Sequence, residues 1–220
     1  MRVLIEARVP AAPLCLASTD VAPTANLLAD AFDDDPAYVY LFPDGRNRPA
    51  GLRDLFRRNL SVHLPFACTF IARDGNRPVA TVTLRPPEGI RISPITMLRN
   101  GLVPFAVAHG ARAVRRLFAL KHAYDALERQ AAGGRPHWHV HMMVVDRALQ
   151  GRGLGSQLLV SVLEHAIGAR AGERHPIVLT THKPRNVTFY RRAGFEVVDE
   201  RQITQGRNRY AVWSMSRPTG

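Results

Sequence analysis

Three glycines fall within five residues, at Gly151, Gly153 and Gly155, in the segment DRALQGRGLGSQLL. A β-rich run, HWHVHMMVV, precedes them, and a leucine-rich stretch follows at once. Glycine costs roughly 1 kcal/mol against alanine inside a helix and is favoured only where the backbone turns sharply or approaches something closely. The pattern therefore predicts a strand, a tight glycine loop and a helix, in that order.

A loop of this kind directs several backbone N–H groups and the positive end of a helix dipole toward one point, which favours an anion such as phosphate. Two common phosphate motifs fit poorly. A P-loop ends in Gly-Lys-Ser/Thr, and this loop has no lysine; a dinucleotide fingerprint reads GxGxxG, whereas this loop reads GxGxG. The alternative is a surface turn in a glycine- and arginine-rich chain.

Composition predicts one globular domain. The chain has 220 residues, 46% of them hydrophobic, which suffices for one core. No apolar run approaches the ~20 residues of a membrane span, and Glu6 and Arg8 interrupt the apolar start too early for a signal peptide. We therefore expect a cytoplasmic protein with no membrane partner, in which residues 1–13 form a flexible leader and residues 14–220 a single domain.

The formal net charge is +12, but the positive residues are spread thinly along the chain. Arginines occur in ones and twos, and no nucleic-acid motif with interleaved aromatic residues is present, which favours a solvated basic surface over nucleic-acid binding. Such a surface would also attract an anionic cofactor. Cys15 and Cys68 have neither metal-ligand spacing nor the number needed for a disulfide framework, so we assign them no chemistry.

Hydrophobic periodicity predicts a mixed order of helices and strands. Helical patterns cover residues 21–32, 50–64, 92–130, the stretch from the glycine loop to about 170, and 186–193; β-rich runs cover 14–18, 67–73, 78–84, 137–145, 176–181, 195–203 and 209–216. Asp74-Gly75 predicts a hairpin between the second and third of these runs. Residues 33–49 are expected to form a loop. The fold class is α/β (α+β).

Two motifs resemble the GNAT superfamily of N-acetyltransferases. QGRGLG, preceded by VVD, matches that superfamily's Q/R-x-x-G-x-G/A signature, and PRNVTFYRRAGFEVV is similar to its second motif, an Asn with a Tyr four residues later and a following Gly-Phe pair. The resemblance is closest to the puromycin N-acetyltransferase-like branch, because DAFDDDPAYVYLFPD and RYAVWSMSR look like that branch's first and last segments. It runs from about residue 14 to 217, but residues 92–134 match nothing there.

The resemblance implies a GNAT fold, with a mixed, mostly antiparallel central sheet whose strands are splayed to admit acetyl-CoA, flanked by helices. It implies acetyl-CoA as co-substrate, no metal, and a small-molecule amine as acceptor, with puromycin-like amines among the candidates. A protein or peptide N-acetyltransferase is one alternative, and a non-catalytic acyl-CoA-binding regulator is another. The identity of the acceptor, the acyl chain length and the oligomeric state, a homodimer included, stay open.

The same resemblance implies a set of cofactor-binding residues. The pyrophosphate is expected on the backbone amides of Gln150, Gly151, Arg152, Gly153, Leu154 and Gly155, with Ser156 adding a contact. The pantetheine arm is expected to pair like an extra strand with the main chain of Met143, Val144 and Val145. Asn186 is expected to bind the same arm and also to cap the helix around it.

For catalysis, Tyr190 resembles the superfamily's general acid, a phenol that returns a proton to the CoA sulfur. Many relatives carry a glutamate base in the strand before the Asn motif, and here Thr180 stands in its place. In histone-type members a glutamate base lies on the strand before the glycine loop, and the matching position here is His139. We therefore expect His139 to serve as the base.

Strand alternation predicts that His137, His139 and His141 share one face, opposite Trp138, Val140 and Met142. The alternative for these histidines is that they pack or line the cleft. A three-histidine metal site is disfavoured, because the three positions span about 13 Å along one strand.

The segment DDDPAYVYLFPD lies where relatives hold the acceptor. Its acidic residues, Asp33, Asp34 and Asp35, would suit a cationic amine, although an ordinary solvated turn explains them equally well. Tyr38, Tyr40 and Phe42 add an aromatic cluster to the same segment.

Overall fold

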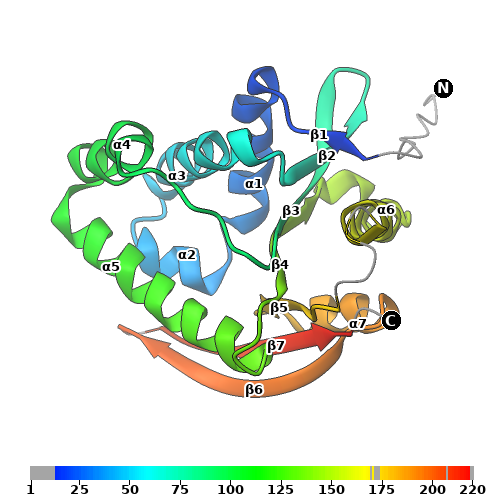
Figure 1. Ribbon diagram of the computed structural model, residues 1–220. Helices are drawn as coiled ribbons and strands as arrows, with labels where there is room; N and C mark the ends of the chain where they lie inside the picture. Colours follow the sequence, from blue (N-terminus) through cyan, green and yellow to red (C-terminus); the bar gives the residue numbers. More distant parts are fainter. Residues whose placement is uncertain (1–12, 169, 171–173, 207, 219–220) are drawn as a thin grey trace.

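Strands from both ends of the chain form one seven-stranded sheet in the computed structural model (Figure 1). The structure describes residues 13–168, 170, 174–206 and 208–218. The expected leader, residues 1–13, lies outside the described residues except for Pro13.

The elements follow the predicted order closely. The strands are β1 (Leu14–Cys15), β2 (Thr69–Asp74), β3 (Arg77–Arg85), β4 (Trp138–Val145), β5 (Ile177–Thr181), β6 (Glu196–Gln205) and β7 (Asn208–Arg217). The α-helices are α1 (Val21–Phe32), α2 (Pro36–Leu41), α3 (Arg48–His63), α4 (Pro94–Thr96), α5 (Leu102–Ala131), α6 (Leu154–Gly168) and α7 (Pro184–Arg192). Shorter turns are η1 (Ser18–Asp20), η2 (Leu64–Phe66), the π-helical η3 (Met97–Gly101) and η4 (Arg147–Leu149).

The strand order in the sheet is β1-β2-β3-β4-β5-β7-β6. Every neighbouring pair is antiparallel except β4 and β5, which run parallel. The fold class and the mixed, mostly antiparallel sheet are therefore confirmed. The predicted hairpin is confirmed as well, because Asp74 pairs with Arg77 across a tight turn in which Gly75 has a φ of +57°.

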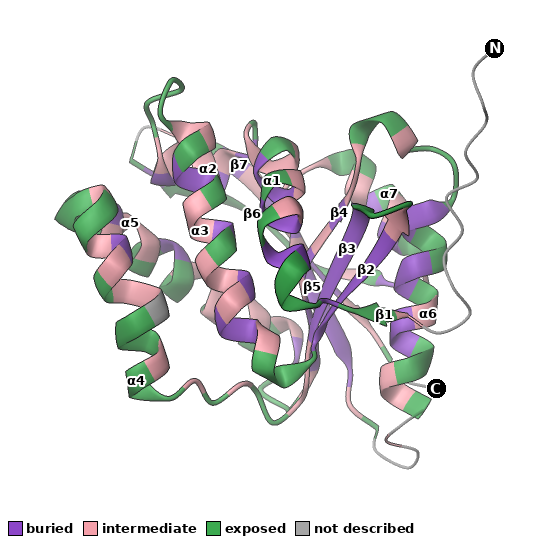
Figure 2. Cartoon of the chain, turned by 90° about the horizontal axis from the view of Figure 1, so that it is seen from above, coloured by how far each residue is buried: buried purple, intermediate pink, exposed green. Residues whose placement is uncertain are grey.

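Helices cover both faces of the sheet. In two perpendicular views, α1, α2, α3 and α5 lie on one side and α6 and α7 on the other (Figures 1 and 2). One buried core joins α6 and α7 to strands β2 to β5, and a second joins α1 and α3 to the other face of β2 and β4. Within the described residues, no helix combines the length and the apolar character that crossing a bilayer requires.

The sheet divides in its centre, between β4 and β5. The two strands pair only at Trp138 with Ile177 and at His139 with Val178. Beyond those pairs, β4 continues along β3 and β5 continues along β7. The carboxyl ends of the two parallel strands therefore diverge, and the edge of β4 that faces β5 lacks a strand partner after His139.

A β-bulge lies in β4, at His141. Thr83 of β3 pairs with Met142 and the next residue, Leu84, pairs with Val140, so His141 is an extra residue in β4. A bulge shifts the phase with which side chains alternate between the faces of a sheet.

The expectation that Trp138, Val140 and Met142 share a face is therefore wrong. Trp138 and Val140 pack in the core with α6, whereas Met142 packs in the core with α1 and α3. The ring of His141 contacts His63 of α3, so His141 lies on the same side as Met142. The bulge thus turns two consecutive residues toward the helices α1 and α3.

Two regions depart from the predicted elements. Residues 33–49, expected as a loop, contain α2, because Pro36 stands at its first position and the Asp35 side chain caps it by accepting from the Ala37 amide at 3.0 Å. The helical stretch 92–130 is interrupted by the π-helical turn η3 and by Gly110, whose φ of +76° breaks α5.

We expect Gly155→Val to lower the free energy of unfolding by about 1–3 kcal/mol, the usual cost of overpacking. A Cβ on Gly155 would stand 3.1 Å from Val145 Cγ2 and 3.3 Å from Met143 Cε. The matched control is Gly168→Val at the other end of α6, where a Cβ would meet nothing within 4 Å. Urea denaturation measures both variants, and equal losses would contradict the packing explanation.

Candidate active site

The glycine loop joins the open end of β4 to the start of α6. Gly151 and Gly153 adopt φ values of +79° and +82°, a left-handed conformation that other residues adopt only with strain. Asp146 begins the loop, where its carboxylate accepts from the Ala148 amide at 2.9 Å and pairs with Arg77 at 2.7 Å. The loop conformation is thus held from within the chain, and the first turn of α6 follows directly.

Gly155 is needed for a different reason. It is buried in the first turn of α6, where a Cβ would meet side-chain atoms of Val145, Met143 and Phe189 at 3.1 to 3.5 Å, so a larger side chain would crowd the packing of α6 on β4 and α7. Leu154 is buried beside it. The remaining predicted loop residues, Gln150, Arg152 and Ser156, are exposed.

Met143, Val144 and Val145 form the carboxyl end of β4, past the point where β5 diverges. Val144 is buried toward α1 and α3, whereas Met143 and Val145 pack toward α6. One of the main-chain groups predicted for the cofactor is already used, because Gln150 Nε2 donates to the Val145 carbonyl at 3.0 Å.

Helix α7 places Tyr190 and Asn186 beside β5. Tyr190 is buried between Phe189 and Phe195, and burial raises the pKa of its phenol, which keeps the hydroxyl protonated. Asn186 does not cap α7 as predicted, because Lys183 occupies the N-cap position. Its amide instead donates to Thr181 Oγ1 at 3.0 Å, at the end of β5.

The predicted base, His139, lies at the last pair that joins β4 to β5. Its Nδ1 stands 3.0 Å from Glu128 Oε2 of helix α5, and the second oxygen of that carboxylate stands 2.9 Å from His137 Nε2. His137 Nδ1 faces the Arg135 carbonyl at 2.8 Å, so both nitrogens of this ring meet acceptors. Within the described residues, no hydrogen bond engages His139 Nε2.

The charge state of this cluster follows from its contacts. The bond to Glu128 raises the pKa of His137, which favours the imidazolium. Burial opposes ionisation of Glu128, but the hydrogen bond from His137 and the close contact with His139 outweigh it and hold the pKa of this carboxyl far below its usual range. Glu128 is therefore a half-buried carboxylate that contacts two histidines.

Two further histidines lie next to His139. The rings of His139 and His141 meet at 5.5 Å, and His141 stacks on His63 at 5.5 Å. Burial lowers the pKa of His141 well below its usual value, with the charges of His139, His63 and Arg85 adding to the effect, and burial also lowers the pKa of His63. His63 Nδ1 faces the Asn59 carbonyl at 2.7 Å, so its neutral ring carries its proton there.

A second buried polar network ends at the carboxyl end of β5. Asp35 Oδ2 stands 2.9 Å from His182 Nδ1, and Tyr124 Oη of α5 stands 2.7 Å from His182 Nε2. Tyr124 Oη is also 3.1 Å from Tyr210 Oη, whose hydroxyl donates to Gln205 Oε1 at 2.6 Å. Burial and the neighbouring Tyr210 raise the pKa of Tyr124. The network joins α5, β7 and the turn before α2.

The three consecutive aspartates all have partners within the chain. Asp33 pairs with Arg48 at 3.2 Å, and Asp35 pairs with His182. Asp34 pairs with Lys183 at 2.8 Å, beyond the end of β5, and stands 3.7 Å from Arg147, beyond the end of β4. The bond from Lys183 lowers the pKa of Asp34. The turn between α1 and α2, which consists of Asp33, Asp34 and Asp35 and which we call the aspartate turn, therefore bridges the open end of the divided sheet.

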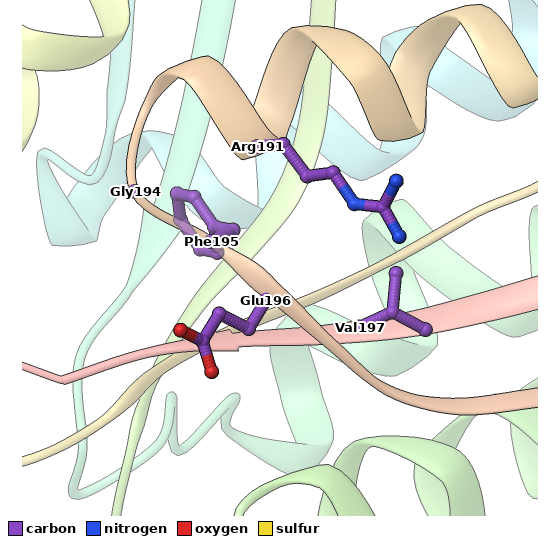
Figure 3. A pocket seen from close by; sticks show the side chains of 5 residues that line it. All are labelled: Arg191, Gly194, Phe195, Glu196 and Val197. Carbon is purple, nitrogen blue, oxygen red and sulfur yellow. The ribbon is translucent and has the colours of Figure 1, made fainter.

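A surface hollow of about 440 Å³ lies elsewhere, between the end of α7 and the start of β6 (Figure 3). Its lining residues are Arg191, Gly194, Phe195, Glu196 and Val197. None of them belongs to the glycine loop, the divided strands or the histidine cluster, so this hollow is separate from the candidate site.

Residues 125–209, which contain β4, the glycine loop and α7, match the family described as an acetyltransferase (GNAT) domain. The matched segment, which is less than half of the chain, is similar to that domain. Members of this family are N-acetyltransferases with acetyl-CoA as co-substrate, so the protein is an acetyltransferase. The divided sheet and the loop at its open end agree with that role.

Solved structures share the fold over nearly the whole chain. A Corynebacterium glutamicum protein, described as histone acetyltransferase HPA2 and related acetyltransferase, aligns with a TM-score of 0.57 and 22% identity over 95% of this chain and 96% of that one. An agmatine N-acetyltransferase aligns with a TM-score of 0.56 and 16% identity, over 93% and 97%. The polyamine N-acetyltransferase of Drosophila melanogaster aligns with 0.55 and 16%, over 92% and 97%. At such low sequence identities, these alignments establish the shared fold alone.

The sequence did not predict four polar residues of the two networks as site residues: Glu128, Tyr124, His182 and His63. Tyr124 and Glu128 lie four residues apart on the inner face of α5, next to the buried Leu120 and Leu127. Polar side chains at core-facing positions of a helical pattern were the available signal. The pattern alone does not say which strand such a helix covers.

We expect His137 to stabilise the fold more at low pH than at high pH. Its raised pKa means that its contribution is complete below its ordinary value of 6.5 and is lost as the pH rises through the higher value of the folded state. The free energy of unfolding of His137→Gln should therefore differ from wild type more at about pH 5.5 than at about pH 8.5.

Urea denaturation at the two pH values measures this difference. His122→Gln, on the exposed side of the same helix α5, controls for the removal of an imidazole. Glu128 sets the lower limit of the window, because its lowered pKa keeps its contribution complete above its ordinary value of 4.5. A difference for His137→Gln that is the same at both pH values would contradict the ion pair with Glu128.

Proposed function

We propose that this GNAT domain transfers the acetyl group of acetyl-CoA to a primary amine of a small molecule. One observation carries the proposal. Where β4 and β5 diverge, β4 carries an imidazole beside a half-buried carboxylate and leads into a glycine loop suited to an anion. We further propose that residues 14–220 act as a single domain, which the continuity of the sheet from Leu14 to Arg217 supports. The proposed location of this domain is the cytoplasm.

The cofactor residues fit the expected co-substrate. The edge of β4 that faces β5 lacks a strand partner from Val140 to Val145, which suits an arm with amide groups that pairs like a strand. The exposed amides around Gly151 and Gly153 suit the pyrophosphate at the start of α6. Within this proposal Ser156 and Arg152 add polar contacts, and Asn186 reaches the arm from the end of β5.

Acetyl-CoA supplies an acetyl thioester, which a neutral amine attacks at the carbonyl carbon. The amine must therefore lose a proton, and His139 Nε2 is the acceptor that we propose. This nitrogen has no hydrogen-bond partner within the described residues, and it belongs to the last residue before the strands diverge.

Glu128 acts as a positioning residue in this proposal. Its carboxylate stands 3.0 Å from His139 Nδ1, which favours the tautomer with the proton on Nδ1 and leaves Nε2 free to accept. The same negative charge would stabilise the imidazolium that forms. His141 and His63 have no carboxylate contact of this kind, and the pKa of each is lowered, which makes them weaker proton acceptors.

Tyr190 is the proposed general acid. Its phenol is held protonated by burial in the core beside α6 and β5, on the opposite face of the sheet from Glu128. An acid on one face and a base on the other face of the divided sheet suit a reaction in which the thioester lies between them. The proton from Tyr190 would go to the departing sulfur.

The class of acceptor is supported by what covers the histidine cluster. Helices α1, α2, α3 and α5 lie over that face of the sheet, and the aspartate turn spans its open end (Figure 2). A covered site suits a small amine, whereas a protein substrate needs an open groove. Structures described as agmatine and polyamine N-acetyltransferases share the fold, which also supports an amine acceptor. Puromycin-like amines are among the acceptors that we propose.

The proposed acid and base are tested by His139→Gln and Tyr190→Phe. Each variant is expected to lose about 10²- to 10⁴-fold in kcat, the usual contribution of a positioned proton donor or acceptor. The dissociation constant for acetyl-CoA should change little. CoA release across a panel of puromycin, polyamines, amino acids and short peptides measures turnover, and calorimetry measures binding.

Turnover by wild type of peptides alone would replace the small-molecule acceptor with a protein one. Binding of acetyl-CoA without turnover of any amine would favour a regulator that binds acyl-CoA. Unchanged kcat in His139→Gln would remove this residue from the base role, and His63→Gln and His141→Gln would then identify the acceptor of the proton.

The role of Glu128 is tested by Glu128→Gln, which keeps the size of the side chain and removes its charge. We expect the acidic limb of the pH profile of kcat/KM to move toward lower pH, because the neighbouring negative charge that favours the imidazolium is gone. Glu128→Asp should restore part of the wild-type profile. An unchanged profile with reduced stability would mean that the contact is structural only.

A further inference from the structure

A second hollow, of about 370 Å³, lies between the start of α1, the end of α3 and the turn η3. Three arginines line it, Arg57, Arg58 and Arg99, together with the hydroxyls of Ser18 and Ser61. Helix α1 has 12 residues and is therefore about 18 Å long, and the aspartate turn follows its far end. The hollow is thus remote from the open end of the divided sheet.

The hollow keeps an excess of positive charge. Asp20, beside the lining residues of α1, is paired with Arg73, and Asp54 is engaged by Arg57 at 3.0 Å, by Arg58 at 2.8 Å and by His109 at 2.9 Å. Although burial opposes ionisation, these bonds lower the pKa of Asp54 to about 2. Within the described part of the chain, no carboxylate pairs with Arg99. Two of the three guanidinium groups thus share one carboxylate, and a phosphate would suit the remaining positive charge.

Exposed apolar side chains lie on the same segment as Arg99, which runs from α4 through η3 to the start of α5. Next to Arg99 in sequence, Leu98 is 64% exposed, and Ile95 and Val107 are 68% and 84% exposed. Val103 is exposed between them. The steps between them are three, five and four residues, close to a helical repeat. The step of five residues runs from Leu98, in the π-helical turn η3, to Val103 in α5. We call these four residues the apolar stripe. Figure 2 shows α4 and the start of α5 as the outermost helical layer on this side.

The charge of this segment complements an anionic surface. No aspartate or glutamate occurs between Glu88 and Asp125, whereas six arginines or lysines do. A basic segment with an exposed apolar stripe is typical of helices that lie on a membrane surface. A second copy of this chain would bring the same basic residues face to face, in molecules that each carry a net charge of +12. A bilayer of anionic lipid carries the opposite charge and therefore avoids this repulsion.

We propose that the face formed by the arginine-lined hollow and the apolar stripe docks on anionic membrane lipid. The phosphate of a lipid headgroup would occupy the hollow, and the apolar stripe would enter the boundary between headgroups and acyl chains. The exposed stripe favours a lipid over a free phosphate, because a soluble ion would leave these side chains in water. The aspartate turn at the far end of α1 stays away from the lipid, so amine and acetyl-CoA keep access to the divided sheet.

The full chain is tested by co-sedimentation with vesicles of phosphatidylcholine alone and of phosphatidylcholine with phosphatidylglycerol. Wild type should bind the anionic vesicles only, and less at high salt. Arg99→Gln should weaken this binding about fivefold, as expected for one basic residue near the surface. Val107→Gln should weaken it several-fold through lost apolar burial.

Matched controls change the same residue types on the other side of the sheet. Arg192→Gln removes an exposed charge from α7, and Val198→Gln removes an apolar side chain that is 51% exposed on β6. Both should bind anionic vesicles like wild type, and thermal unfolding confirms that all four variants are folded. Equal losses in the control variants would mean that net charge and general stickiness, rather than this face, drive binding.

Three other outcomes overturn the proposal. Failure to bind anionic vesicles excludes it directly. Binding of glycerol phosphate in calorimetry that depends on Arg99, without vesicle binding, would assign the hollow to a free phosphate. Binding of a polyglutamate peptide that depends on Arg99 and Val107, again without vesicle binding, would assign the face to an acidic protein.

Discussion

The parting of β4 from β5 is the constraint on which the rest of this structure depends. Two parallel strands that pair at two positions and then diverge leave backbone N–H and C=O groups without a ladder partner. Unpaired backbone groups are costly when buried, so a sheet retains such an opening only where a ligand or water replaces the missing strand. The glycine loop begins where β4 ends, and this places an anion-binding helix start at the same opening.

Burying ionisable groups beside that opening requires partners from distant parts of the chain. Glu128 is half-buried and contacts His137 and His139, and the buried Asp35 contacts His182. An unpaired buried carboxylate would instead take up a proton, because low polarity disfavours its charge. Helix α5 supplies a partner to each network, Glu128 to the first and Tyr124 to the second. Helix α5 thus completes the polar lining of the histidine side.

The aspartate turn shows how one short motif serves several structural needs. Asp35 caps α2 and holds His182, while Asp34 joins groups that follow β4 and β5. Asp33 pairs with Arg48, and Asp34 pairs with Lys183. The acidic side chains therefore hold the covering helices across the opening.

Local patterns determined most elements, the hairpin at Asp74 and the glycine loop, because alternation, helical repeat and turn residues act within a few positions of sequence. Only the tertiary structure decided that His141 forms a bulge, that Glu128 faces His139, and that Asp34 bridges two strand ends. An extra residue in a strand leaves no local mark, since it is defined by the register of its neighbour. Contacts between α5 and the sheet likewise depend on how a whole helix packs, which no short stretch of sequence specifies.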